Sequence, residues 1–561
     1  MEKKLWYILL SITMVISYSC KDFMTVEPEG YKIGEQTFET ADDAINGVYG
    51  LYGMIQPLVD QIYLAGEAQG DLVLAARGAD KYIAEIAQNR VTPQNPYTDF
   101  TNFYKLIVAC NNALAGVTHI NQIDPVNFGQ EKYKLTVGEI KCIRAWTYLQ
   151  LVKIWKDVPY VSEAITSVDQ ITAVAPEERD VILRNILQDV LDSYSVMQTA
   201  RLNNTYPFAD INKSRAQFTA QSVTFLLSDI YLHLGDYVNA YSTIFPILPY
   251  GERDNETLRG ISPSLSPSYW YLKINGYFPE ALYKEWCWYI RFDGSRAQTN
   301  SLQKWTNNKN GGVYALKPSA NAIEYWNNTG MMLTSYQITA AGFYFNYLQP
   351  RGFNYVSDNE GYPIQGCMGD SLRGPGFSYQ IDGKDTLIFK YIMKDRYKER
   401  SIQNGDLYSN DDAPFLIYRT GPFYLKTMEM LNNMGNSSMA YDFLNGGQGS
   451  EGPPTSTRSR VWCMPFRFNP NGESTQKQVN RFILEEMALE GAFEGLRWFD
   501  LVRFAERPGY ESWLGDYISM KYPTAQREAI KTRLANSDYW YWPYYYKNVA
   551  TNKLLEQKSG Y

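Results

Sequence analysis

Three ionisable residues recur at helical spacing near the C-terminal end of the chain. Glu490, Glu494 and Arg497 stand at i, i+4 and i+7, which would place them on one face of a continuous helix. A pair of carboxylates is typical of a glycosidase, in which one acid and one nucleophile or base flank the bond that breaks. Arg497 would, however, hold down the pKa of Glu494, whereas a general acid needs a raised pKa. We therefore interpret these residues as a structural ion-pair network and predict no catalytic residue, with a surface glycosidase as the less favoured alternative.

Other motifs that could bind a metal or a phosphate are incomplete. The chain has two histidines, His119 and His233, which are far apart in the sequence. This removes most histidine-based metal sites and catalytic triads. The segment 469–473, NPNGE, lacks the full ligand spacing of a calcium loop and is typical of a turn. The glycine run at 446–449 is not followed by Lys-Ser or Lys-Thr, as a phosphate loop would be. The sequence therefore predicts neither a metal nor a cofactor.

Aromatic rings accompanied by polar side chains indicate ligand capture instead. Aromatic residues make up 15% of the chain, and a compact domain can bury only some of them. Rings pack against the apolar faces of sugars, while amides, carboxylates and guanidinium groups bond to hydroxyls. Two regions combine these groups, the segment 71–95 and the region that follows 246. The predicted glycan-binding residues are Asp71, Arg77, Tyr82, Trp305, Tyr314, Trp326 and Arg373.

Size and charge limit the classes of protein and partner. A chain of 561 residues exceeds the usual size of one hydrophobic core, so one large composite domain or two to three lobes is expected. Its 45% hydrophobic and 20% charged residues are ordinary for a folded protein. The net charge of -7 has the wrong sign for a protein that binds phosphate backbones, so we expect no nucleic-acid partner.

The first twenty residues have the organisation of a secretory signal. Two lysines precede an apolar stretch, and a small-residue site stands directly before Cys20. The apolar stretch is too short to cross a bilayer as a helix, so the Cys20 thiol is the natural place for a lipid, although Ser17 stands where such signals usually carry Leu. We therefore expect a lipoprotein signal peptide over 1–19, lipid attachment at Cys20 and a tether over 20–40.

The elements that must position the candidate residues are mainly helices. Apolar residues recur at helical spacing before residue 245 and after residue 415. The sequence Gly235-Asp236-Tyr237 resembles the turn between the two helices of a tetratricopeptide repeat (TPR). Between them, the pattern changes to Gly, Pro, Asn, Ser and aromatic residues. We expect a mainly α fold: a TPR-like scaffold over 41–245 and 415–561, with a loop-rich, aromatic-rich, ligand-binding insertion over about 246–414.

A series of motifs along nearly the whole chain resembles the SusD/RagB family. In order, the motifs are Cys20-Lys21-Asp22-Phe23; Asp42-x-x-Ile45-x-Gly47-x-Tyr49; Glu139-x-x-x-x-Arg144-Ala145-x-x-Tyr148-x-x-Leu151, running to Asp157-Val158-Pro159; Ile417-Tyr418-Arg419; Phe482-Ile483-Leu484-x-Glu486; Phe493-Glu494-Gly495-x-Arg497-Trp498-Phe499-Asp500-Leu501; and Asn552-x-x-Leu555-x-Gln557-x-x-Gly560-Tyr561. Their order matches that family as well as their content. Members are surface lipoproteins of Bacteroidota that act with TonB-dependent transporters.

The resemblance implies a SusD-like helical scaffold with a loop-rich face and no catalysis. It implies a lipid-anchored protein, exposed on the surface of the cell outer membrane, that binds an oligosaccharide or polysaccharide. The expected partner is a SusC-like TonB-dependent outer-membrane transporter, to which the glycan is delivered. The alternative is a peptide-binding uptake lipoprotein of the RagB type, because the aromatic excess favours sugar over peptide only modestly.

Overall fold

The structure is a computed structural model of the chain. The residues it describes are 38–202, 216–247, 286–309, 311–329, 370, 373–374, 378–391, 411–445, 466–469 and 472–561. The expected signal peptide, Cys20, the glycine run and most of the expected insertion lie outside the described residues. The described part consists mostly of helices packed on one another, so the predicted mainly α fold is confirmed.

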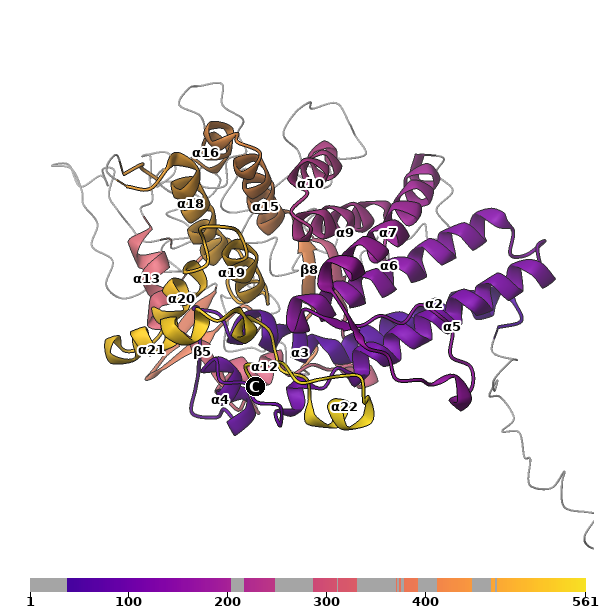
Figure 1. The fold of residues 1–561 in the computed structure, drawn as a ribbon, viewed down its shortest axis with the longest axis horizontal. Helices are drawn as coiled ribbons and strands as arrows, with labels where there is room; N and C mark the ends of the chain where they lie inside the picture. Colours follow the sequence, from indigo (N-terminus) through magenta and orange to yellow (C-terminus); the bar gives the residue numbers. More distant parts are fainter. Residues whose placement is uncertain are drawn as a thin grey trace, which may run out of the picture.

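The N-terminal half is a layer of long helices lying side by side (Figure 1). These helices are α2 (Ala41–Ile55), α5 (Thr101–Ile123), α6 (Gln130–Trp155), α7 (Arg179–Leu202), α9 (Ala220–His233) and α10 (Tyr237–Ile244). Helix α6 packs between α5 and α7 and is buried on nearly all sides over its last four turns, as its two apolar stripes predict. Thr40 and Asp43 form a capping box that begins α2.

The C-terminal half adds a second group of helices, which apart from α22 lie on the other side of the view in Figure 1. They are α15 (Thr420–Asn433), α16 (Ser437–Asn445), α18 (Thr475–Glu490), α19 (Arg497–Ala505), α20 (Trp513–Ser519), α21 (Thr524–Leu534) and α22 (Tyr546–Thr551). Shorter described helices are α3 (Val59–Tyr63), α4 (Lys81–Ala87), α12 (Leu302–Thr306) and α13 (Ala320–Asn328). The two halves meet where α10 packs against α15.

Two helical hairpins share the TPR-like turn. Gly235 ends α9 with φ +73°, and Gly435 follows α15 with φ +88°, a left-handed conformation in which glycine carries no Cβ penalty. Ala240 and Ala440, five residues later in each hairpin, are fully buried where the two helices touch. The sequence LGDYVNA therefore forms the predicted turn, and MGNSSMA repeats it in the C-terminal half.

The described residues form four small antiparallel sheets, two of which tie distant segments together. They pair β1 (Val73–Ala75) with β5 (Leu316–Pro318), β2 (Val158–Pro159) with β3 (Pro176–Glu177), β4 (Trp286–Ile290) with β8 (Phe415–Arg419), and β6 (Tyr379–Asp382) with β7 (Asp385–Ile388). The β1–β5 pair joins the N-terminal part of the scaffold, and the β4–β8 pair its C-terminal part, to segments of the expected insertion that the structure describes. They fix those segments on the helical scaffold.

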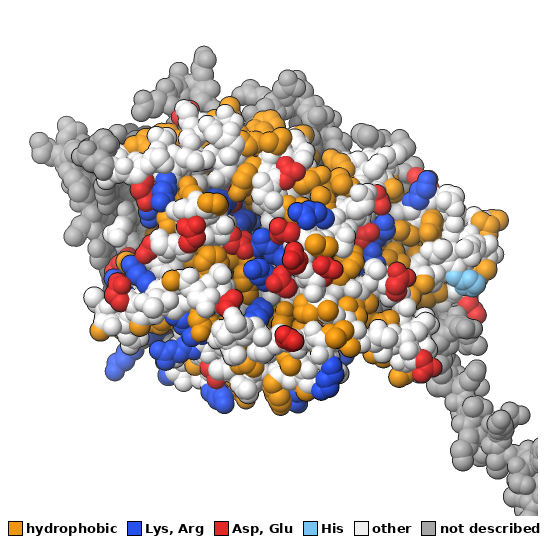
Figure 2. All heavy atoms as spheres, viewed as in Figure 1, with side chains coloured by type: hydrophobic (Ala, Val, Ile, Leu, Met, Phe, Trp, Pro, Cys, Tyr) orange, Lys and Arg blue, Asp and Glu red, His pale blue; other side chains and the backbone are white. Residues whose placement is uncertain are grey.

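The surface bears on the expected partners. On the face shown in Figure 2, acidic and basic side chains are interspersed among hydrophobic ones rather than gathered into one broad basic surface. This distribution suits the net charge of -7 and does not suit a phosphate backbone. In the described part of the chain, we find no helix with the length and apolar character needed to cross a membrane.

Candidate functional site

The β1–β5 pair brings together the two regions in which binding residues are predicted. Val73 lies opposite Pro318, and beyond the strands the Gly78 N–H donates to the Tyr314 carbonyl at 3.0 Å. This approach requires a glycine, because a Cβ on Gly78 would lie 1.6 Å from the Val313 carbonyl oxygen. The segment that follows β1 and the segment that precedes β5 therefore lie against each other.

A group of polar side chains, here called the Arg77 cluster, gathers at this junction. Its members are Arg77, Asn308, Lys309, Tyr314, Asp382 and Asp385. Arg77 forms a bidentate ion pair with Asp385, with Nη2 2.8 Å from Oδ2, and its guanidinium lies 4.8 Å from the centroid of the Tyr314 ring. The Arg77 side chain is 64% exposed, so the cluster is open to solvent.

Amide and ammonium groups complete the cluster from the loop after α12. Asn308 Nδ2 donates to Asp385 Oδ2 at 2.8 Å and to Asp382 Oδ2 at 3.0 Å, and Lys309 Nζ donates to Asp382 Oδ1 at 2.9 Å. Asp382 is the last residue of β6 and Asp385 the first of β7, so the two acids flank the turn of the hairpin, in which Gly383 has φ +62°. The hairpin thus holds two carboxylates against Asn308, one of them paired with Arg77 and the other with Lys309.

Tyr314 is held in a strained position at the centre of the cluster. Its φ of +54° lies in the left-handed region, which costs a non-glycine residue about 1–2 kcal/mol. The Tyr314 hydroxyl donates to the Thr386 carbonyl at 3.0 Å and accepts from the Thr386 N–H at 3.1 Å. These bonds and the Arg77 guanidinium fix the ring in place.

The two carboxyl groups are acceptors and not proton donors. Hydrogen bonds from Arg77 and then Asn308 lower the pKa of Asp385 to about 2. Hydrogen bonds from Lys309 and Asn308 likewise lower the pKa of Asp382. Both groups are ionised at neutral pH, so the cluster offers fixed charged acceptors, N–H donors and a ring, without a general acid.

Two of the charged residues predicted to bind glycan lie in the interior. Asp71 is fully buried and accepts from Arg497 Nε at 2.7 Å and Nη2 at 3.0 Å. Arg373 is fully buried and donates to Asp370 at 2.6 Å and to Glu486 at 2.6 Å. In this structure their side chains bind protein groups and present no surface to a ligand.

The predicted aromatic contacts are divided between interior and surface. Trp326, on α13, is 1% exposed and packs on Phe493, and Trp305 is 5% exposed and meets Tyr97 edge to face. Tyr82, on α4, is partly exposed, with Lys81 Nζ 5.0 Å from its ring centroid. Of the seven predicted residues, Arg77 and Tyr82 reach the surface, and Tyr314 lies directly beneath Arg77.

The ionisable residues near the C-terminal end are buried, but they do not share one helical face. Helix α18 ends at Glu490, and Phe493 and Gly495, with φ +63° and +78°, turn the backbone before α19 begins. The single helix expected from the spacing is therefore wrong, and Arg497 pairs with Asp71 rather than with Glu494. The turn separates residues that a continuous helix would stack.

Glu490 and Glu494 take their partners from other segments. Arg419, on β8, donates from Nη1 to Glu490 Oε1 and from Nε to Glu494 Oε2, each at 2.8 Å. Arg373 Nη1 also reaches Glu490 Oε2 at 3.1 Å, and Lys390 Nζ reaches Glu494 Oε1 at 2.6 Å. Burial opposes the ionisation of Glu494, but Arg419 and Lys390 outweigh it and hold its pKa below the usual value. This arrangement stabilises a charged carboxylate.

Glu67 is an important buried residue that sequence reasoning missed. Its carboxylate accepts the N–H groups of Phe493 at 2.8 Å and Gly495 at 2.9 Å, so it holds the turn between α18 and α19. Burial raises its pKa to about 7. The glycine that precedes it, Gly66, is the one hint that the sequence offers, since a glycine can mark a close approach of two backbones. In the structure a Cβ on Gly66 would lie 1.9 Å from the Gly495 carbonyl oxygen.

Four members of the Arg77 cluster were missed as well, namely Asn308, Lys309, Asp382 and Asp385. The sequence Asp382-Gly-Lys-Asp385 contains the Asp-Gly pair that favours a tight hairpin, and this pair could have indicated the β6–β7 turn. Nothing in the sequence indicates that this hairpin meets the segment after β1, some 300 residues earlier in the chain.

Comparison with known proteins identifies the class. Residues 383–561 match the family model of the SusD family. SusD-like protein P38 of Formosa agariphila is 23% identical over 88% of this chain and 90% of that protein. SusD-like protein P2 of the same organism is 23% identical over 42% of this chain and 44% of that protein.

Solved structures share the fold. A SusD superfamily protein from Bacteroides thetaiotaomicron superposes with a TM-score of 0.63 at 16% identity, covering 93% of this chain and 99% of that one. A laminarin binding SusD-like protein superposes with a TM-score of 0.60 at 14% identity, covering 93% and 100%. The family match over residues 383–561, together with similarity to SusD-like proteins over most of the chain, supports a SusD/RagB family protein.

Proposed function

We propose that this protein is a lipid-anchored protein of the outer-membrane surface that binds an oligosaccharide or polysaccharide and delivers it to a SusC-like TonB-dependent transporter. The observation that carries the glycan part is the Arg77 cluster, in which an exposed guanidinium lies over the buried Tyr314 ring and is joined to an amide and two ionised carboxylates. The charged and amide groups of the cluster complement the hydroxyls of a sugar. The fold shared with a laminarin binding SusD-like protein supports the same class of ligand.

A peptide of the kind taken up by RagB-type proteins is the alternative ligand. Carboxylates and guanidinium groups also bind peptide termini and charged side chains. Arg77 and Asp385 already neutralise each other, so a charged ligand would have to separate them. A neutral hydroxyl can bond to the remaining N–H groups and lone pairs without breaking the pair. This difference favours a glycan.

We infer that the bound glycan is not cleaved. The pKa of Asp385 and that of Asp382 are both lowered, so neither acid of the Arg77 cluster can donate a proton at neutral pH. The other carboxylate pair, Glu490 and Glu494, is buried and held by cations. A surface glycosidase therefore remains the less favoured alternative.

Calorimetric titration of the purified protein with laminarin, other oligosaccharides and a set of peptides tests the ligand class. We expect saturable binding of a glycan, weakened roughly tenfold or more by Arg77→Met, because a charge-assisted hydrogen bond donor is lost. Arg481→Met is the matched control: Arg481 also pairs with an acid, Glu473 at 2.7 Å, and lies 4.8 Å from the ring of Trp513. Binding of neither class, equal loss in both variants, or release of product during titration would refute the proposal.

Anchoring and delivery require separate experiments. Metabolic labelling with a lipid precursor should mark the wild-type chain and leave Cys20→Ala unmarked, since the proposed attachment is through that thiol. Co-purification of a large TonB-dependent barrel with the membrane-bound chain would support delivery. Labelling that persists in Cys20→Ala, or purification without any such barrel, would count against this part of the proposal.

A further inference from the structure

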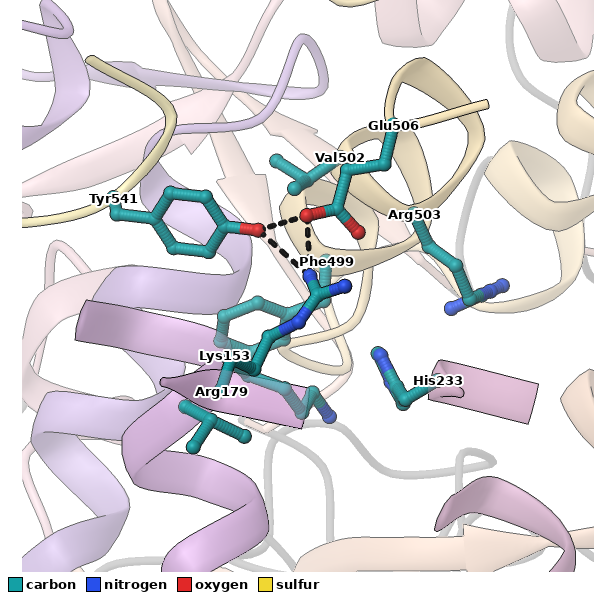
Figure 3. Close-up of a pocket in the computed structure, with 9 residues that line it drawn as sticks. Lys153, Arg179, His233, Phe499, Val502, Arg503, Glu506 and Tyr541 are labelled. Carbon is teal, nitrogen blue, oxygen red and sulfur yellow. Dashed lines mark hydrogen bonds and ion pairs between the residues drawn. The ribbon is translucent and has the colours of Figure 1, made fainter. Parts of the chain in front are cut away.

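A small cavity lies where three N-terminal helices meet the C-terminal half. We call it the Lys153 cavity. Its polar lining consists of Lys153 from α6, Arg179 from α7, His233 from α9, Arg503 from α19, Glu506 directly after α19, and Tyr541 (Figure 3). The space inside is about 10 Å³, on the order of one water molecule or one small ion. A sugar ring is much larger than this space.

One of the cations is neutralised inside the cavity. Arg179 forms an ion pair with Glu506 and bonds to the Tyr541 hydroxyl at 3.1 Å. Figure 3 shows these three groups together, while the nitrogen-bearing ends of Lys153, His233 and Arg503 face the remaining space. The sole carboxylate in the lining is thus taken by Arg179.

The other three groups present N–H donors without acceptors. Arg503 donates from Nε and Nη2 to Glu429 at 2.9 and 2.8 Å, but its Nη1 has no partner among the described residues and its side chain is only 4% exposed. The buried Nε2 of His233 likewise has no partner within the described part of the chain. Lys153 makes no hydrogen bond to any described group, and its Nζ lies 4.6 Å from the Phe499 ring centroid.

The surrounding carboxylates are paired with other cations. Asp229 accepts from Lys426 at 2.7 Å, and Asp500 lies 2.8 Å from Arg503. Glu429 serves both Arg503 and Arg507, and the exposed Asp180 contacts Arg179 from outside at 3.2 Å. Asp229 and Asp500 act on Lys153 only through space, so its charge stays uncompensated by direct contact. Burial lowers the pKa of Lys153 to about 8, which reflects the cost of holding a cation there.

We propose that the Lys153 cavity is a binding site for a small monovalent anion of the halide class, such as chloride. The anion would accept from Lys153 Nζ, Arg503 Nη1 and the His233 ring N–H. Burial lowers the pKa of His233 well below its usual value, so the ring is neutral and keeps one N–H to donate. Because the three donors come from α6, α9 and α19, the bound anion fastens the N-terminal helices to the C-terminal half.

The first test is thermal unfolding of the full chain in sodium chloride and in sodium gluconate at equal ionic strength. Chloride should raise the melting temperature of the wild type saturably, by about 2 °C or more. Lys153→Met keeps the apolar stem and removes the cation, so the increment should vanish without loss of folding in gluconate. Lys134→Met, an exposed lysine on the same helix, should keep the full increment. An equal increment in all three proteins would overturn the proposal.

The second test locates the ion directly. Crystals grown with sodium bromide should show an anomalous scattering peak in the Lys153 cavity of the wild type and none there in Lys153→Met. A cavity that holds only water in bromide-grown wild-type crystals would overturn the proposal. This outcome is independent of whether the protein binds a glycan.

Discussion

Replacing Glu494 by glutamine distinguishes a structural carboxylate from a catalytic one. In the structure Glu494 Oε1 accepts from Lys390 Nζ at 2.6 Å and Arg419 Nη2 at 3.0 Å, while Oε2 accepts from Arg419 Nε at 2.8 Å. Glutamine preserves the shape but accepts at one position only, so its amide N–H₂ would face a cation. The variant therefore leaves two buried cations with one carboxylate fewer.

The expected cost follows from what remains. Removing one partner of a buried ion pair lowers the free energy of unfolding by about 3–5 kcal/mol. Lys390 keeps its bond to the Ala492 carbonyl at 2.8 Å, and Arg419 keeps Glu490, so we expect the lower end, about 3 kcal/mol. The lowered pKa of Glu494 likewise shows that its ionised form stabilises the folded state. Its contribution to stability is present above the unfolded carboxyl pKa and is lost as pH falls below it.

Urea unfolding followed by circular dichroism measures this loss as a lower midpoint. Glu473→Gln is the control, because Glu473 pairs with Arg481 at 2.7 Å but both side chains are about one-third exposed. Removing that surface pair should cost less than about 1 kcal/mol. The reasoning is refuted if Glu494→Gln is as stable as the wild type, or if it abolishes a hydrolytic activity that the wild type displays.

Two further predictions concern buried positions on the N-terminal side. Burial raises the pKa of Glu139 to about 7, so the wild type loses stability as pH rises from the unfolded carboxyl pKa toward 7. Glu139→Gln does not ionise, and it still accepts the hydrogen bond from the Tyr52 hydroxyl. Between pH 5 and 7, urea titrations should therefore show roughly 2–3 kcal/mol less loss of stability in the variant than in the wild type. Gly66→Ala would press a Cβ against the Gly495 carbonyl and should cost about 3 kcal/mol or more, whereas Gly53→Ala, with open space around it, should raise the melting temperature slightly. An equal pH response for wild type and Glu139→Gln, or equal melting temperatures for the two alanine variants, would contradict these expectations.

The helical scaffold could be predicted because its signals are local. The two apolar stripes of α6 require neighbours on both sides, and α5 and α7 supply them. The turn at Gly235 needs a residue that adopts positive φ, and the sequence places glycine there. Both inferences depend on residues within one or two turns of each other, where periodicity is informative.

The binding residues were harder to predict because the type of a charged or aromatic residue does not show whether its side chain is buried or exposed. Charged residues are usually exposed, so Asp71 and Arg373 were natural candidates for a ligand. Each instead meets a partner distant in sequence: Arg497 for Asp71, and Glu486 for Arg373. Trp326 was chosen from a loop-rich composition, yet it lies on α13 and is buried. Only tertiary packing distinguishes these residues from Arg77.

The part of the chain that the SusD family model matches is mainly the structural part. Residues 383–561 include Lys390, Arg419 and Glu494, which hold the turn between α18 and α19. Of the Arg77 cluster, Asp385 falls within the match, whereas Arg77 and Tyr314 precede it. A match to this C-terminal third of the chain concerns the scaffold and does not extend to Arg77 or Tyr314. At 23% identity, the ligand of a relative does not identify the ligand of this chain. The ligand panel should accordingly range beyond laminarin, because all members of the Arg77 cluster except Asp385 lie outside the segment that the family model matches.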